Sequence, residues 1–520
     1  MKTKIVLFTG LLLACGQVFA QGEIDALRMS RNDLAGTARG QAMGGAFGAL
    51  GGDVTGITIN PAGLGVYTRS ELSTSLSFTN ARDNTDWNGI TRKENQFKVN
   101  FETLSYIAAL EMDNVSMPVF NVGFSYNRLK NFNRRYNAST GGMGTSLTDY
   151  IEVRTNGDDY TIGDGWADYY SSKAPWLSIL GYDGKLIVPT GTDTYGAPLP
   201  KGEKVDPALW VSERGSINNY DFSFATNIED EWYFGVDFSL TDIEYKVSTN
   251  YLEDFPLGPG GENYGINLDN TLATDGSGYQ FKLGAIWKPL DELRVGVAYH
   301  SPTWYQMTDY FYGKTKADYA DIEGGTSLKA STPLPPDDVT DYYFHTPYSW
   351  TFSLAGVISD FGIVSVDYEL KDYTSMNISN LNGVDMEAND YIDADFKVAS
   401  TLRAGAEVRF TPQFSGRLGY AWLQNPYEKT FRDGWREAII VGTIPNFTIE
   451  GNTQYFTAGV GYKFTPSTYL DLACVYQTRK DNLYAFPSVW DADGKSLVAS
   501  EPATLNHSVL KTMVTLGYKF

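Results

Sequence analysis

The chain has 520 residues, enough for two or three ordinary domains or for one large all-β body. A formal net charge of −21 argues against a nucleic acid partner, because binding to a phosphate backbone requires a basic face. The chain has 3 histidines and 2 cysteines, so we expect no metal site, no cofactor and no disulfide framework. The 35 tyrosines, 28 phenylalanines and 52 glycines are instead typical of extensive β-structure with many turns.

Residues 1–20 have the pattern of an export signal peptide. Two lysines precede the apolar run Ile5–Ala14, and a small residue at the end favours cleavage after Ala20. Cys15 leaves an alternative open, because the four residues that end there resemble a lipoprotein cleavage box. Cleavage after Ala20 would leave Cys474 as the single cysteine, so the mature chain could form no internal disulfide.

A glycine-rich segment at residues 39–65 precedes the first strand-like pattern. It is too rich in glycine for a stable helix and too interrupted for a strand. Side chains such as Met43, Phe47 and Leu50 make it too apolar for a solvated linker. We therefore expect it to pack inside a larger body. The motif at its end consists of Asn60, Pro61, Ala62 and Gly63.

The rest of the chain alternates between apolar and polar residues with the period of a β-strand. In the C-terminal strand one face carries Leu510, Val514, Leu516, Tyr518 and Phe520, and the other carries Lys511, Thr515, Gly517 and Lys519. No second apolar stretch is long enough for a transmembrane helix. An exported chain of this kind is secreted, periplasmic or an outer-membrane β-barrel.

The alternation predicts an all-β protein, a transmembrane antiparallel barrel of fourteen strands. The predicted strands are 70–82, 96–111, 118–132, 216–228, 231–250, 277–288, 292–318, 347–358, 362–374, 398–410, 413–425, 452–464, 467–480 and 505–520.

A secreted β-sandwich is the alternative to the barrel, and two features favour the barrel. Very short turns alternate with long connections, the longest at about 133–215, while 83–95 and 251–276 are two shorter ones. The chain also ends on Phe520, which resembles the signal that barrel-assembly machinery recognises.

Two features concern the inside of this barrel. The alternation slips near Glu102–Thr103, which indicates a β-bulge unless 96–101 lies above the membrane. The predicted inward-facing charges are expected to hold a plug or one another: Arg294, Asp367, Glu369, Arg403, Glu407, Arg409 and Arg417. Fourteen strands enclose more space than side chains fill, so residues 39–65 are the expected plug.

The longest loop is the expected ligand capture site, because it is unusually apolar for an exposed loop. An alternative is that its side chains only pack the loop as a lid. The tentative capture residues are Trp166, Tyr169, Tyr170, Trp176, Leu177 and Leu180.

The sequence GGAFGALGGD (44–53), the NPAGL run (60–64) and AYHSPT (298–303) resemble the FadL/TodX family of outer-membrane transporters of hydrophobic compounds. The resemblance implies an N-terminal hatch at 21–68 and a barrel at 69–520. It also implies passive uptake of a fatty acid-like or aromatic ligand, with capture at the outer loops and lateral exit through the wall.

The expected partners are outer-membrane lipids and lipopolysaccharide, a hydrophobic small molecule, and barrel-assembly machinery acting on Phe520. We expect a monomer in the outer membrane. A second hypothesis is a protein-binding component of a secretion or surface-attachment machine, and a third is a general porin. No catalytic constellation is present: the histidines are scattered and no GxSxG motif occurs.

Overall fold

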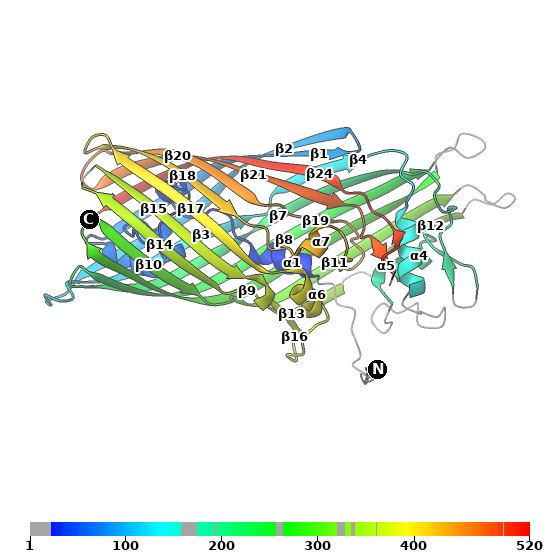
Figure 1. Cartoon of the computed structure of the whole chain (residues 1–520), viewed down its shortest axis with the longest axis horizontal. Coiled ribbons are helices and arrows are strands. Elements are labelled where there is room, and N and C mark those ends of the chain that lie inside the picture. Colours follow the sequence, from blue (N-terminus) through cyan, green and yellow to red (C-terminus); the bar gives the residue numbers. More distant parts are fainter. Residues whose placement is uncertain are drawn as a thin grey trace, which may run out of the picture.

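The computed structural model describes residues 22–157, 174–191, 194–255, 264–319, 328–333, 338–359, 361–491 and 493–520. The predicted signal peptide at 1–20 lies outside these residues. The described chain forms a long, tilted β-barrel, with the C-terminus at the end that carries the short turns (Figure 1).

Fourteen antiparallel strands make the ring, and the pairing of β1 with β24 closes it. In order around the wall they are β1 (Glu71–Trp87), β2 (Ile90–Glu111), β3 (Val119–Asn131), β7 (Asp206–Ile228), β8 (Trp232–Phe255), β9 (Tyr264–Leu290), β10 (Leu293–His300), β14 (Ser349–Ile358), β15 (Gly362–Asp372), β17 (Val398–Arg409), β18 (Phe414–Leu423), β20 (Thr453–Lys463), β21 (Thr468–Tyr484) and β24 (Ala503–Lys519). The predicted fold class is therefore confirmed.

The two faces of the wall have the polarity that the alternation predicts. On β8, Phe234 and Val236 are 43% and 49% exposed on the outside, whereas Asp237 and Ser239 are buried on the inside. An apolar outer band and a polar inner face are the pattern of a barrel that spans a membrane.

The predicted loop at 83–95 is wrong. Strands β1 and β2 continue to Trp87 and Ile90 and are joined by Asn88 and Gly89, both of which have positive φ. The predicted loop at 251–276 is wrong for the same reason, because β8 and β9 extend into it. In the added part of β1 the buried inward residues Asp83 and Thr85 are polar, as are the outward residues Asn84 and Asp86, so the apolar–polar alternation that marks a strand disappears there.

The predicted strand 292–318 is interrupted at Pro302, which has no backbone N–H to donate to a ladder. After the break, β11 (Trp304–Tyr319) continues beside β9 and pairs with β12 (Leu328–Pro333) and β13 (Asp338–His345). The wall is therefore taller on this side. The outer connection between β3 and β7 contains a further strand, β4 (Arg134–Ser139), which pairs with β7.

The predicted bulge is confirmed at Glu102. Ser75 is opposite Thr103 and Leu76 is opposite Phe101, so Glu102 is the extra residue in β2.

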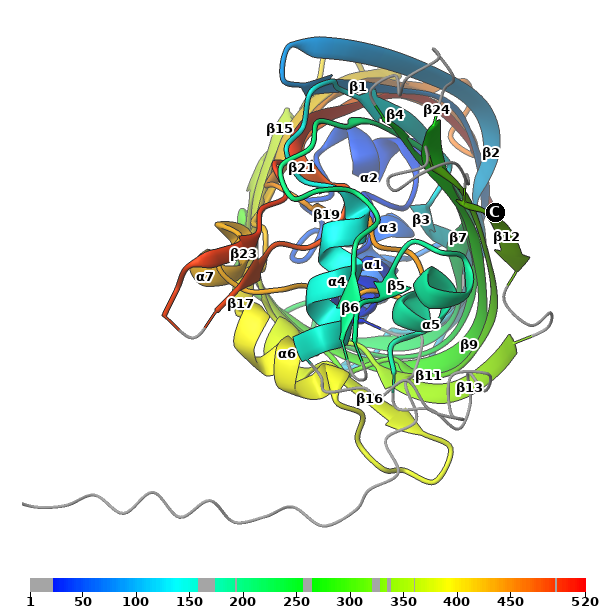
Figure 2. The ribbon, with the colours of Figure 1, turned by 90° about the vertical axis from the view of Figure 1, so that its right-hand side faces the viewer.

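Short elements cover the outer end of the barrel (Figure 2). They are α4 (Leu147–Gly157), α5 (Trp176–Asp183), α6 (Ala388–Asp395), α7 (Lys429–Arg432), η2 (Tyr373–Ser375), β5 (Val188–Pro189), β6 (Tyr195–Gly196), β16 (Asn377–Asn380), β19 (Phe447–Ile449), β22 (Val489–Trp490) and β23 (Ser496–Val498). Their apolar side chains join those of the upper wall and of the N-terminal segment in one large hydrophobic cluster.

Residues 22–70, here called the N-terminal segment, contain α1 (Glu23–Ser30), α2 (Ala38–Ala42), α3 (Thr55–Ile59) and η1 (Pro61–Val66). Figure 2 shows α1, α2 and α3 inside the ring of strands. No described helix has the length and apolar character needed to cross a bilayer.

Candidate functional site: the lumen, the N-terminal segment and the β2–β3 gap

The NPAG motif fastens the N-terminal segment to itself and to the wall. The side-chain oxygen of Asn60 accepts from the Ala62 N–H at 3.1 Å, which caps η1. The Nδ2 of Asn60 donates to the Gly48 carbonyl at 2.7 Å and to the Ala285 carbonyl of β9 at 3.2 Å. Because Asn60 is buried, these bonds have no competition from water.

Two wall glycines allow this motif to approach so closely. Gly235 and Gly284 face each other on β8 and β9. A Cβ on Gly235 would overlap the backbone of Pro61 and Ala62, and one on Gly284 would lie 2.9 Å from the Ala62 nitrogen. The absence of side chains at both positions is therefore a condition of the fit.

The preceding part of the segment lies on a second pair of wall glycines. Gly405 and Gly419 are opposite each other on β17 and β18, and a Cβ on either would overlap the backbone at Met43. Gly44 and Gly45, with φ of 64° and 75°, turn the chain at this point. Glycines in the wall thus leave room for the backbone of the segment, and glycines in the segment allow it to turn at the point of contact.

A buried ionic network joins the same segment to the wall. Arg39 donates to both carboxylate oxygens of Glu407, at 2.9 and 3.3 Å. Glu407 also accepts from Arg417 at 2.7 Å, and Arg417 reaches Asp471 at 2.5 Å. A bidentate Arg–carboxylate pair fixes orientation as well as position.

Other inward charges bind the segment's backbone. Asp367 accepts from the Gly48 N–H at 3.0 Å, and Arg294 donates to the Leu50 carbonyl at 2.5 Å. Arg403 pairs instead with Glu369. The interpretation that inward charges hold a plug-like segment or one another is confirmed for these residues.

Three lysines from separate strands reach the first part of the segment. Lys130 of β3 donates to the Arg28 carbonyl at 2.6 Å and Lys371 of β15 to the Ser30 carbonyl at 2.7 Å. Lys511 of β24 donates to the Leu34 carbonyl at 3.1 Å.

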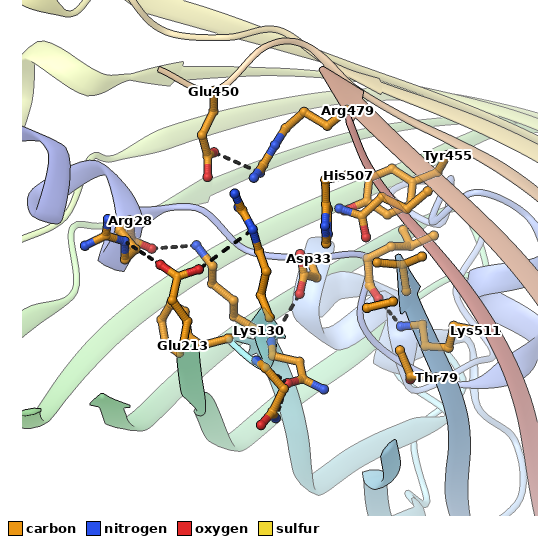
Figure 3. A pocket seen from close by; sticks show the side chains of 18 of the residues that line it. Arg28, Asp33, Thr79, Lys130, Glu213, Glu450, Tyr455, Arg479, His507 and Lys511 are labelled. Atoms are coloured by element: carbon orange, nitrogen blue, oxygen red, sulfur yellow. Dashed lines mark hydrogen bonds and ion pairs between the residues drawn. The ribbon is translucent and has the colours of Figure 1, made fainter. Parts of the chain in front are cut away.

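Two cavities lie in the lumen, of about 120 and about 150 Å³. Asp33, Leu34 and Tyr455 line both, so this part of the N-terminal segment separates them. Figure 3 shows the smaller cavity, which is lined by Lys130 of β3 and Lys511 of β24.

The hydrogen-bond ladder between β2 and β3 is incomplete. It runs from Thr103 to Glu111 on β2, and residues 90–102 pair only with β1 among the described residues. Beyond Asn127, β3 no longer pairs with β2 but stays paired with β7 as far as Asn131. Leu129 is an extra residue in this stretch, and its carbonyl accepts from the Asp33 N–H at 2.8 Å. Residues 95–102 thus form an unpaired edge, here called the β2–β3 gap.

The gap borders the smaller cavity, because Glu102 of β2 and Arg128 of β3 line that cavity. It lies within the apolar outer band, because Phe97 and Leu510 are both opposite Asn80 of β1. Closer to the outer end of the barrel, β4 takes the place of β3 beside β2: the side chain of Asn137 on β4 donates to the carboxylate of Glu94 on β2 at 2.6 Å.

The outer end of α1 is held by loops. The Glu23 carboxylate accepts from the Ile439 N–H at 3.1 Å and its second oxygen is buried without a partner. Burial raises the pKa of Glu23 to about 8, and nearby Asp395 adds to the effect. Burial also raises the pKa of Asp395 to about 6, although Arg436 opposes this.

The predicted capture residues divide into two groups. Trp166, Tyr169 and Tyr170 lie outside the described residues. Trp176, Leu177 and Leu180 lie on α5 and are buried in the outer hydrophobic cluster. Their burial is accounted for by packing of the loop over the mouth, and their part in capture stays a prediction.

A family model described as "Outer membrane protein transport protein (OMPP1/FadL/TodX)" matches residues 214–507, more than half of the chain. The chain belongs to this family. It is therefore an outer-membrane transport protein and not an enzyme. No curated protein matches the sequence.

Solved structures of FadL/TodX proteins have the same fold. A Pseudomonas aeruginosa FadL homologue is 12% identical, with a TM-score of 0.55, and the match covers 94% of this chain and 100% of that one. A TodX deletion mutant, described as a monoaromatic hydrocarbon channel, is 15% identical, with a TM-score of 0.51 and coverage of 94% and 99%. Identity at this level establishes the fold alone.

Sequence reasoning missed the wall glycines and the three lysines. A glycine in a strand is visible in the sequence, but the strand register decides which ones meet Pro61 or Met43. The lysines bind backbone carbonyls, which leave no mark in a sequence. No group of three or more metal-ligating side chains occurs among the described residues.

Proposed function

We propose that the protein is a passive channel for hydrophobic compounds, which pass the outer loops, cross the lumen and leave sideways into the bilayer. The β2–β3 gap is the observation that carries this proposal. It combines an unpaired strand edge, an adjoining cavity and a position within the apolar outer band.

The driving force is transfer of the ligand out of water, which is worth about 0.8 kcal/mol per CH₂ group. No nucleotide is needed. Cavities of about 120 and 150 Å³ are comparable to one that holds a benzene molecule. An aromatic ligand fits them as they are, and a fatty acid-like chain requires the N-terminal segment to move.

The N-terminal segment serves as the plug in this proposal. Its contacts with Gly235, Gly284 and Glu407 fix it across the lumen. Deletion of residues 36–66 should raise permeability to small polar solutes while the barrel still assembles. Unchanged permeability would refute the plug.

The test of function is to purify the full mature protein in a mild detergent and identify what co-purifies by mass spectrometry. A bound lipid or aromatic compound supports transport. A bound secreted protein supports the secretion-partner hypothesis instead. If neither co-purifies and the protein shows high conductance in a planar bilayer, the transport and secretion-partner hypotheses are both refuted in favour of a general porin.

A further inference from the structure

A groove lies on the outward face of the wall, outside the lumen. It has a volume of about 460 Å³ and is formed by β4, β7, β8, β9 and β11, which are neighbours there. Among the described residues it shares no lining side chain with either lumen cavity. The groove is therefore a feature of the outer surface and is separate from the path proposed for the transported compound.

Two exposed aromatic side chains stand at the sides of this groove. Trp210 of β7 and Tyr312 of β11 are 45% and 43% exposed. Strands β8 and β9 lie between β7 and β11, so the two residues are about three strand spacings, or about 14 Å, apart. Aromatic side chains in such positions are favoured at binding surfaces, where the ring packs against a ligand.

The floor between the two aromatic side chains is polar. Ser248 and Thr271 lie side by side with their hydroxyl oxygens 3.2 Å apart, and Asn250 donates to the Asp269 carboxylate at 2.5 Å. Hydroxyl, amide and carboxylate groups bond readily to the hydroxyl groups of a ligand. A sugar ring has an apolar face of C–H groups that stacks on an aromatic ring and an edge of hydroxyl groups. The groove therefore has the chemistry of an oligosaccharide site.

The groove lies well above the apolar outer band. On β8 that band ends at Leu240, and Ser248 follows eight residues later on the same face. This length of strand spans about 26 Å, or about 20 Å along the membrane normal at the tilt usual for such barrels. The polar headgroup region extends only about 5–7 Å beyond the hydrocarbon. The groove is thus at the level of the sugars that lipopolysaccharide of the outer leaflet carries.

Charged side chains occupy the wall between the apolar band and the groove. Arg214 and Lys246 are opposite each other on β7 and β8, one outward row below the groove. Asp242, Glu244 and Asp275 face outward nearer the band. Lipopolysaccharide carries phosphates, which Arg and Lys bind, and divalent cations, which carboxylates bind. Charges of both signs at this level therefore complement lipopolysaccharide, whereas a soluble neutral glycan would leave them unused.

We propose that this groove binds the oligosaccharide of a lipopolysaccharide molecule in the surrounding outer leaflet. Trp210 and Tyr312 stack on sugar rings, and the polar floor bonds to their hydroxyl groups. Arg214 and Lys246 bind phosphate groups on the part of the molecule nearer the membrane. The inference is independent of the transport proposal, because the groove lies outside the lumen.

Oligosaccharide released from lipopolysaccharide by mild acid allows the sugar to be tested without lipid A. Calorimetric titration of the full mature protein in a neutral detergent should show that this phosphorylated oligosaccharide binds at least about tenfold tighter than a dextran oligosaccharide of equal length. Trp210→Ala and Tyr312→Ala should each weaken its binding about tenfold, whereas Tyr312→Phe keeps the ring and should retain most of it. Arg214→Gln/Lys246→Gln should remove the preference over dextran. Trp435→Ala is the control, because Trp435 is 59% exposed and lies outside the groove.

Oxidation of tryptophan by N-bromosuccinimide supplies a second readout that needs no variant. The released oligosaccharide should protect Trp210 in the wild type and leave Trp435 as reactive as before, as read by mass spectrometry. Absence of binding, or equal binding by the wild type and the Trp210 and Tyr312 variants, would overturn the inference. Equal oxidation of Trp210 with and without the oligosaccharide would overturn it as well. Equal affinity for dextran would assign the groove to soluble glycans and overturn the lipopolysaccharide assignment.

Discussion

Alanine at Gly235 should loosen the docking of the N-terminal segment, the proposed plug, without harming the barrel. The added Cβ would overlap the backbone of Pro61 and Ala62, so no flexible side chain is available to yield. Overpacking of this kind costs about 1–3 kcal/mol. If the cost falls on docking of the segment, the undocked population rises about 5- to 150-fold. Strand β8 itself keeps its pairing with β7 and β9.

Gly356→Ala on β14 is the matched control, because a Cβ there meets nothing within 4 Å. Both variants should fold, as judged by the heat-dependent shift of a barrel on a gel. Liposomes with Gly235→Ala should swell faster in a small sugar than those with Gly356→Ala. Amides of residues 57–66 should also exchange faster. Equal swelling and equal exchange in the two variants would refute the argument that Gly235 allows the N-terminal segment to dock against the wall.

Two further predictions concern charge. Glu407→Ala should raise permeability more than Arg39→Ala, because the first leaves Arg39 and Arg417 without their shared carboxylate, whereas the second leaves Glu407 paired with Arg417. Liposome swelling checks this order, and the reverse order would contradict it. The pKa of Glu23 is raised from 4.5 to about 8, so docking of α1 is most stable below pH 4.5 and weakens as pH rises to about 8. Glu23→Gln stays neutral, so hydrogen exchange of α1, corrected for the intrinsic rate, should depend less on pH than in the wild type; an equal dependence would contradict this.

The sequence predicted the strands well wherever lipid touches the wall. Period-2 alternation is a local signal, and Phe234, Val236 and their neighbours on β8 obey it because one side faces apolar chains and the other faces the lumen. The signal fails at 83–95, where the outward side chains of β1, such as Asn84 and Asp86, are polar and the buried inward ones, such as Asp83 and Thr85, are polar too. The hairpin there depends on its turn at Asn88 and Gly89.

The site was less predictable because it is made by contacts between distant parts of the chain. The NPAG motif was recognised, but its partners Gly235 and Gly284 follow from the register of β8 against β9. The gap follows from a ladder that stops at Thr103, and no residue type in the sequence marks where pairing ends. The apolar side chains of α5 were visible, whereas their burial depends on how the loop folds back.

Lateral exit is the central claim, and reversible closure of the gap tests it directly. The Nη1 of Arg128 lies 3.0 Å from the Oδ1 of Asn100 across the gap. Both residues are replaced by cysteine in a Cys474→Ser background, and the two thiols are joined by a bis-methanethiosulfonate. The control joins cysteines at Ser105 and Ser125, which already face each other on the paired part of β2 and β3. The account predicts that decanoate uptake into proteoliposomes stops when the gap is cross-linked, returns on reduction, and is unchanged in the control. Uptake that continues through a cross-linked gap would contradict it.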